Sequence, residues 1–143
     1  MRVFPGISVV TLGVRNVERA TIFYESLGWR ASRQDSSTAA SFFRLNNLVL
    51  ELRPSDVLAR STGLPGIRDT GLVVLGQNYG GVQAATGALK QAGLAGGALL
   101  RPLGPQRGGH IEGSFADPDG HVWTVVFDPR RPPAPDGSVS LAP

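Results

Sequence analysis

The feature of the sequence that most constrains its fold is an internal repeat. An apolar, β-branched stretch at residues 7–14 predicts a buried strand, and the pattern at 17–27 predicts an amphipathic helix. The same succession returns at 71–76 and 82–91, where the helical pattern is weaker and is closed by Gly93. The chain is therefore expected to form two related modules.

Two short matches set the alignment of the copies. Leu12-Gly13 corresponds to Leu75-Gly76, and residues 47–52 correspond to 120–125. This alignment pairs Val9 with Leu72 and Glu51 with Thr124.

Three extended stretches follow each predicted helix: 30–35, 40–45 and 48–53 in the first copy, and 98–103, 111–116 and 121–128 in the second. Asn46-Asn47 tolerates the positive φ of a tight hairpin, and Asp117-Pro118-Asp119-Gly120 has the composition of a turn. We expect an α+β fold with two βαβββ modules, 7–53 and 71–128, in one domain spanning 1–128. The link at 54–70 has room for a short helix at 56–60, and the proline-rich tail at 129–143 is expected to be extended.

The first helix has clear boundaries. Asn16 can accept a hydrogen bond as N-cap, and Glu18 places a negative charge in the first turn. Val17, Thr21, Tyr24 and Leu27 share a helical stripe that ends at Gly28.

Composition excludes several classes of function. The 143-residue chain has no cysteine, so disulfides, thiolate metal sites and cysteine nucleophiles are absent. The net charge of +3 comes from arginines scattered along the chain, with Lys90 the sole lysine, so no nucleic-acid partner is expected. Without a signal-peptide pattern or a run of ~18 apolar residues, we expect a cytoplasmic protein with no membrane partner.

Three segments carry a resemblance to a known family. They are residues 10–20 leading to Phe23-Tyr24 and Leu27-Gly28-Trp29, the stretch 48–52, and the closing motif 115–121. Over residues 7–128 the chain resembles the vicinal-oxygen-chelate superfamily of glyoxalases, bleomycin-resistance proteins and dioxygenases. The resemblance implies a curved four-stranded sheet with a helix behind it in each module, and a ligand cleft enclosed by paired modules.

The resemblance also implies four metal-ligand positions, at Val9, Glu51, Leu72 and Thr124. Only Glu51 is a plausible ligand, because a divalent cation needs several lone-pair donors. A one-residue slip would give Ser8, Gly71 or Trp123, which are no better ligands. We therefore expect no metal and no cofactor.

Strand parity predicts which side chains face the cleft. If Glu51 faces inward, Leu48, Leu50 and Leu52 face the helix, and Trp123, Val125 and Phe127 pack behind the second sheet. The predicted cleft residues are Val9, Thr11, Val49, Glu51, Arg53, Leu72, Val74, Val122, Thr124 and Val126.

Two further groups are candidate ligand contacts. One of Phe42 and Phe43 must face the cleft, where an aromatic ligand could stack and Arg44 or Arg53 could add a contact. His110, Glu112 and Ser114 share one face of their strand, which is either open to water or part of the cleft lining. His121, at the start of the last strand, is interpreted as an ordinary polar position.

The leading hypothesis for function is a homodimer that sequesters an aromatic or peptide-like natural product, such as an antibiotic, without metal. The alternative is a glyoxalase-like lyase or isomerase, or a dioxygenase-type enzyme. A metal-free enzyme could use Glu51, paired with Arg53 or Arg44, as a general base. A structural or regulatory protein without a ligand is a third hypothesis. Whether the modules pair within one chain or between chains stays open.

Overall fold

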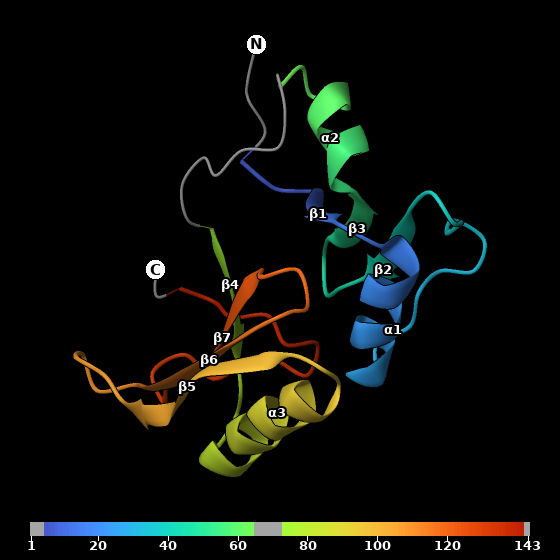
Figure 1. Ribbon diagram of the computed structural model, residues 1–143. Helices are drawn as coiled ribbons and strands as arrows, with labels where there is room; N and C mark the ends of the chain where they lie inside the picture. The colour runs from blue at the N-terminus through green and yellow to red at the C-terminus, as the bar shows by residue number, and fades with distance from the viewer. Residues whose placement is uncertain (1–4, 65–72, 142–143) are drawn as a thin grey trace. The chain divides into compact units, whose positions relative to one another are not determined.

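The computed structural model describes residues 5–64 and 73–141 (Figure 1). It divides into two compact units, Met1–Arg68 and Asp69–Pro143, each with its own sheet and helices. The fold is α+β, with two mixed sheets, as the repeat predicts. No helix among the described residues has the length and apolar character needed to cross a membrane.

The first unit contains a three-stranded sheet and two helices. Its elements are β1 (Val9–Val14), α1 (Val17–Ser26), β2 (Ser41–Arg44), β3 (Val49–Pro54) and α2 (Ser55–Ser61). The strand order is β1-β3-β2, with β1 parallel and β2 antiparallel to the central β3. Helix α2 confirms the short helix expected in the link, and it contacts β1 and β3.

Helix α1 begins and ends at the predicted boundaries. The Asn16 side chain accepts a 2.9 Å hydrogen bond from the Arg19 backbone N–H. Gly28, just beyond the last turn, has a φ of 95°, which glycine adopts without the steric cost of a side chain. Val17, Ala20, Phe23 and Tyr24 are the buried residues of the helix.

An aromatic cluster forms the core of the first unit. Phe43 on β2 is 1% exposed, and its ring lies 6.0 Å from that of Tyr24 and 6.4 Å from that of Trp29. Leu50 and Leu52 are fully buried beside it, as strand parity predicts. Leu48 differs from the prediction: it lies just before β3 and is only half-buried.

The prediction of a strand at 30–35 is wrong. Only an isolated bridge between Ala31 and Phe43 forms there, and the chain then turns at 33–35. The Ser32 hydroxyl donates a 2.6 Å hydrogen bond to Asp35 Oδ2 and accepts from the Asp35 backbone N–H. Such local bonds between side chain and backbone compete with a strand ladder, which explains why this sheet has three strands.

The hairpin between β2 and β3 forms at the predicted place with different backbone angles. The Leu45 N–H donates to the Leu48 carbonyl across 2.9 Å, which closes the tight turn. Asn46 and Asn47 do not adopt the expected positive φ, which among the described residues occurs only at glycines. Asn46 Oδ1 instead accepts from the Asn47 backbone N–H.

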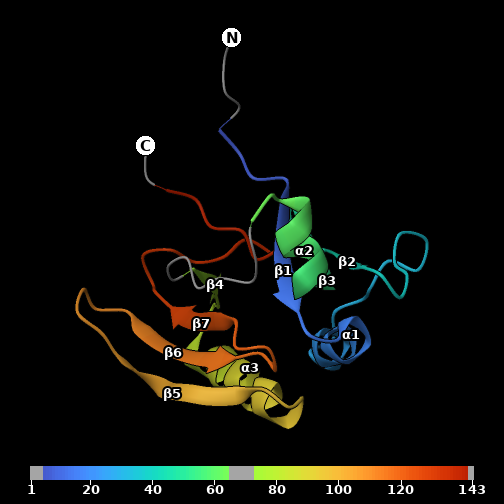
Figure 2. The same cartoon turned by 45° about the horizontal axis from the view of Figure 1, so that its top comes forward.

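The second unit contains a four-stranded sheet covered on one face by a helix (Figure 2). Its elements are β4 (Val74–Asn78), α3 (Val82–Leu94), β5 (Ala98–Pro105), β6 (Ile111–Ala116) and β7 (Val122–Phe127). The order is β4-β7-β6-β5, with β4 parallel to β7 and the other pairs antiparallel. Helix α3 continues through Gly93, where we expected it to close, and the positive φ comes at Gly96.

The core of the second unit lies between α3 and its sheet. Phe115 and Trp123 stack with ring planes 5° apart, and Val125 is fully buried. Leu89 of α3 faces the same side, because a Cβ added at Gly113 on β6 would lie 2.6 Å from Leu89 Cδ1. The structure therefore places Trp123 in the core, as expected, whereas Phe127 is only half-buried.

The Asp117–Gly120 turn joins β6 and β7 in the predicted way. Asp117 Oδ1 accepts hydrogen bonds from the backbone N–H groups of Asp119 and His121, both at 2.9 Å. The Gly120 N–H donates to the Asp117 carbonyl, and Gly120 has a φ of 90°. The buried carboxylate thus organises a turn whose last position favours glycine.

Gly120→Val should therefore lower the free energy of unfolding by about 1–3 kcal/mol. No heavy atom lies within 4 Å of the added Cβ, so backbone strain alone would cause the loss. Urea denaturation measures it. Gly120→Asn is the control, because asparagine tolerates positive φ better than a β-branched residue. Equal stability of the two variants would contradict this assignment.

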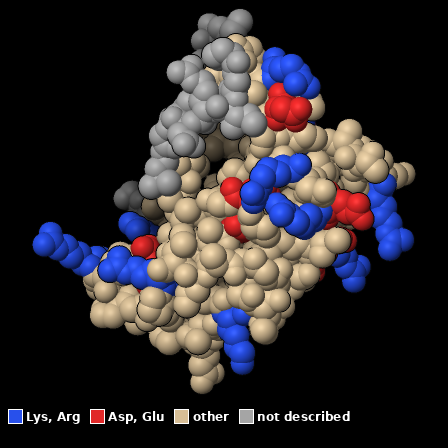
Figure 3. All heavy atoms as spheres, in the orientation of Figure 1, with Lys and Arg blue, Asp and Glu red and all other residues tan. Residues whose placement is uncertain are grey.

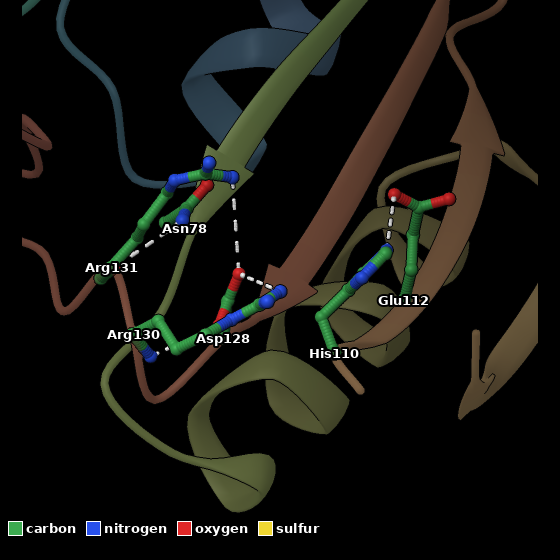
Figure 4. Close-up of polar contacts among 6 residues, drawn as sticks. All are labelled: Asn78, His110, Glu112, Asp128, Arg130 and Arg131. Carbon is green, nitrogen blue, oxygen red and sulfur yellow. Dashed lines mark hydrogen bonds and ion pairs between the residues drawn. The ribbon is translucent and has the colours of Figure 1, made fainter. Parts of the chain in front are cut away.

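Asp128 anchors the start of the C-terminal tail (Figure 4). Its carboxylate is 4% exposed, accepts 3.0 and 3.2 Å bonds from Arg130 Nε and Nη2, and lies 4.0 Å from Arg131 Nη1. The Arg131 carbonyl in turn accepts from Asn78 Nδ2 at the end of β4. Residues beyond this anchor are mostly exposed, and a turn forms at Ala134–Ser138.

Hydrogen bonds from the Arg130 side chain and backbone lower the pKa of Asp128. A carboxyl group whose pKa is lower in the folded than in the unfolded protein stabilises the fold at pH values above the ordinary aspartate pKa of about 4. This stabilisation disappears as the pH falls through the lowered pKa. Asp128→Asn should therefore unfold at a lower urea concentration at neutral pH, and its difference from the wild type should shrink in acid. A difference independent of pH would contradict this role of the carboxylate.

Candidate functional site

One face of the first sheet collects most of the predicted site residues of that unit. Glu51 lies between its strand partners Thr11 and Phe42, and Val49 lies between Val9 and Arg44. Residues paired across neighbouring strands share a face. Phe43, Leu50 and Leu52 point to the opposite face, where they are buried. The predicted parity of the first sheet is therefore present in the structure.

Both carboxylate oxygens of Glu51 have partners on this face. Thr11 Oγ1 donates a 2.9 Å hydrogen bond to Oε1, and Arg53 Nε lies 3.7 Å from Oε2. The Glu51 side chain is 15% exposed and that of Arg53 is 30% exposed. Of the two arginines considered as partners from the sequence, Arg53 is the one that pairs with Glu51.

An open cavity of about 900 Å³ adjoins the same face. It is lined by four predicted residues, Phe42, Phe43, Arg44 and Val49, together with others from the first unit. Phe43 only borders the cavity, since its side chain is buried in the core. Phe42, half-buried on the other face, is thus the aromatic ring available to a ligand.

Several polar residues of the cavity were not predicted as site residues. These are Ser8, Arg30, Ser32, Asp35, Asn46 and Asn47. Arg30, Ser32 and Asp35 lie in the segment expected to be a strand, where parity would have placed Asp35 on the opposite face from Arg30 and Ser32. The serine and aspartate three residues apart, typical of a local turn, could have indicated the bend.

The second sheet has an open face of its own, opposite to α3. In the register of β4, β6 and β7, Thr124 lies between Gly76 and Ser114, and Val122 is beside Val74. Glu112 shares this face, and its Oε1 lies 3.8 Å from His110 Nε2 (Figure 4). Five predicted residues thus share one surface: Val74, Glu112, Ser114, Val122 and Thr124. The predicted Leu72 lies outside the described residues.

Strand register changes the correspondence between the two copies. Glu51 is paired with Thr11, two residues after Val9, whereas Thr124 is paired with Gly76, two residues after Val74. By register, Val74 is therefore the counterpart of Val9, in place of Leu72. A shift of two residues keeps the same face of the strand, and neither side chain carries a lone-pair donor.

The residues at the four metal positions do not fit a divalent cation. Val9, which is 48% exposed, offers no donor atom, and the Glu51 oxygens are engaged by Thr11 and Arg53. Thr124 supplies a neutral hydroxyl, a weak substitute for His, Asp or Glu. Within residues 5–64 and 73–141, no three His, Cys, Asp or Glu side chains form a group able to hold a metal ion.

The family assignment rests on a comparison with known families. Residues 6–125 match the model of the Glyoxalase/Bleomycin resistance protein/Dioxygenase superfamily. The chain belongs to this superfamily. A crystal structure of a glyoxalase-related enzyme from Fulvimarina pelagi is 30% identical, with a TM-score of 0.87 over 98% of this chain and 100% of that one.

More distant superfamily structures share the fold. A glyoxalase/bleomycin resistance protein/dioxygenase family enzyme from Burkholderia phytofirmans is 14% identical, with a TM-score of 0.73, and covers 84% of this chain and 96% of its own. A lactoylglutathione lyase from Agrobacterium tumefaciens is also 14% identical, with a TM-score of 0.67. The match covers 90% of this chain and 98% of that one. No protein with a curated description matches the sequence significantly.

Proposed function

We propose that this superfamily member is a metal-independent binding protein that sequesters an aromatic or peptide-like natural product. The cavity of the first unit is the observation that carries the proposal. Its volume of about 900 Å³ lies within the range of small-molecule sites, roughly 300–1,000 Å³. Phe42 offers a ring for stacking, and arginine and asparagine side chains at the rim offer hydrogen bonds.

The poor fit of the metal positions supports binding over metal-dependent catalysis. Sequestration needs only affinity, which shape and hydrogen bonds supply, so a positioned cation is not required. The face of the second sheet opposite α3, with Ser114, Thr124 and the His110–Glu112 pair, is a separate candidate ligand-binding surface of that unit. We further propose a homodimer, which light scattering after size-exclusion chromatography would detect as twice the chain mass.

One observation favours an enzyme as the second candidate. The Fulvimarina pelagi structure, 30% identical over nearly the whole chain, is described as a glyoxalase-related enzyme. In this chain the catalytic group would be Glu51, which Thr11 and Arg53 hold in place. A carboxylate so positioned could remove a proton from a bound substrate as a general base.

Elemental analysis and ligand titration with Glu51→Gln separate the two candidates. For the binding protein, we expect no stoichiometric metal after purification without chelator. We expect a thermal-shift screen of aromatic natural products to find compounds that bind. A chelator should leave their affinity unchanged, and Glu51→Gln should change it by less than about five-fold. Stoichiometric zinc, nickel, manganese or iron would contradict the proposal. Turnover of a bound compound that Glu51→Gln abolishes would establish the enzyme instead.

A further inference from the structure

We infer that the ligand of the first-unit cavity is an aromatic anion, with its acidic group bound by Arg30 and Arg44 and its ring placed against Phe42. This inference rests on the proposed function and specifies the chemical class of the ligand. It arises from an imbalance of charge among the groups that line the cavity.

Arg30 and Arg44 both line the cavity, and both side chains are exposed. In the described part of the chain, neither has a carboxylate within ion-pair distance. Four other arginines do have such partners: Arg53 with Glu51, Arg60 with Asp56, and Arg130 and Arg131 with Asp128. The guanidinium groups at the cavity are therefore available to an external anion.

The acidic groups near the cavity are already engaged. Asp35 lines the cavity, but its Oδ2 accepts a 2.6 Å hydrogen bond from the Ser32 hydroxyl within its own turn. Glu51 lies on the same sheet face beside Phe42, and Arg53 balances its charge. The lining of the cavity thus contains two arginines and one aspartate, which leaves a net positive charge that attracts anions.

The spacing of the residues fits a small aromatic acid. Phe42 and Arg44 are two residues apart on β2, so they share a face and lie about 7 Å apart along the strand. Because the Arg44 guanidinium ends a long side chain, a single ligand can place an aromatic ring against Phe42 and an acidic group attached to that ring at Arg44. Guanidinium groups bind carboxylates, sulfonates or phosphates through paired N–H donors, which a neutral ligand cannot match.

The test compares two fluorescent probes of similar shape and different charge: anilinonaphthalenesulfonate, an aromatic anion, and phenylnaphthylamine, its neutral analogue. We expect saturable binding of the anion, about ten-fold tighter than that of the amine. Arg30→Gln and Arg44→Gln should each weaken the anion about five-fold and leave the amine within two-fold. Phe42→Ala should weaken both probes. Amide NMR shifts caused by the anion should map to the cavity residues.

Arg60→Gln is the matched control. It removes one positive charge from an exposed site of the same unit, outside the cavity, and should leave both affinities unchanged. Equal loss in Arg60→Gln and Arg44→Gln would mean that net charge alone attracts the anion, which would overturn the inference.

Two other outcomes separate this inference from the proposed function. If both probes bind equally and only Phe42→Ala weakens them, the cavity accepts neutral aromatics, so the inference fails while the proposed function stands. If neither probe shows saturable binding, or if none of the cavity variants changes binding, both the inference and the assignment of the cavity as the ligand site fail.

Discussion

Phe43→Ala should lower the free energy of unfolding by about 3–5 kcal/mol, the usual loss when a large aromatic side chain is removed from a core. Its ring is 1% exposed and contacts the rings of Tyr24 and Trp29. Because the free energy of unfolding of a native protein is only about 5–15 kcal/mol, this loss is a large share of the total stability. Urea denaturation followed by tryptophan fluorescence measures the change.

The neighbouring residue provides a control of identical chemistry. Phe42→Ala removes the same side chain from the opposite face of β2, where it is half-buried at the cavity, and should cost clearly less. It should instead weaken binding of an aromatic ligand. If Phe42→Ala proved the more destabilising of the two, β2 would have the opposite parity, and the cavity would present Phe43.

Gly113→Ala should destabilise the second unit by about 1–3 kcal/mol, although the change adds a single methyl group. The new Cβ would lie 2.6 Å from Leu89 Cδ1 and 3.0 Å from both the Arg101 carbonyl oxygen and the Leu103 nitrogen. The leucine end can rotate, but the two backbone atoms belong to β5 and can move only with that strand. Thermal denaturation would show the loss as a lower melting temperature.

The same substitution in helix α3 should have the opposite sign. Gly87 is exposed in the helix interior, and a Cβ added there meets no atom within 4 Å. Gly87→Ala should therefore stabilise the protein by about 0.5–1 kcal/mol, because alanine loses less conformational freedom than glycine when a helix forms. If both variants shifted stability in the same direction, the close packing of Gly113 against β5 and Leu89 would be incorrect.

The basic side chains are distributed over the visible surface in separate groups. On the face shown in Figure 3, lysine and arginine side chains form several separate groups, most of them beside acidic side chains, and no continuous basic stripe is seen. The positive charge that the proposed ligand requires is local, confined to Arg30 and Arg44 at one cavity. A net charge of +3 would not have predicted that location, because the other arginines lie elsewhere or are paired.

Much of the fold was predictable because its determinants are local. Asn16 and Gly28 mark the ends of α1 through a side-chain cap and a positive φ, and both effects depend only on adjacent backbone. The Asp117–Gly120 turn is likewise held by one side chain bonding to backbone within four residues. Alternation along β3 placed Leu50 and Leu52 in the core, since the period of two is intrinsic to an extended strand.

Other features required the tertiary structure. Residues 30–35 could either form a continuous row of backbone hydrogen bonds with β2 or form a local turn. The hydrogen bonds between Ser32 and Asp35 favour the turn, and only the bridge between Ala31 and Phe43 forms along β2. The choice between Phe42 and Phe43 for the core depended on the aromatic cluster around Tyr24, to which Trp29 contributes from beyond α1. Pairing of β4 with β7 likewise made Val74, in place of Leu72, the counterpart of Val9.

The sequence by itself determined the family, the repeated order of elements, and the absence of His, Asp or Glu from three of the four metal positions. Each of these depends on residue identity and short-range pattern. Only the tertiary structure decided which partner holds Glu51 and that Arg30 joins Arg44 and Phe42 at one cavity. The Thr11–Glu51 hydrogen bond and the position of Arg30 beside Phe42 and Arg44 join residues that are far apart in the chain, so they depend on strand pairing and on the path of the chain between α1 and β2.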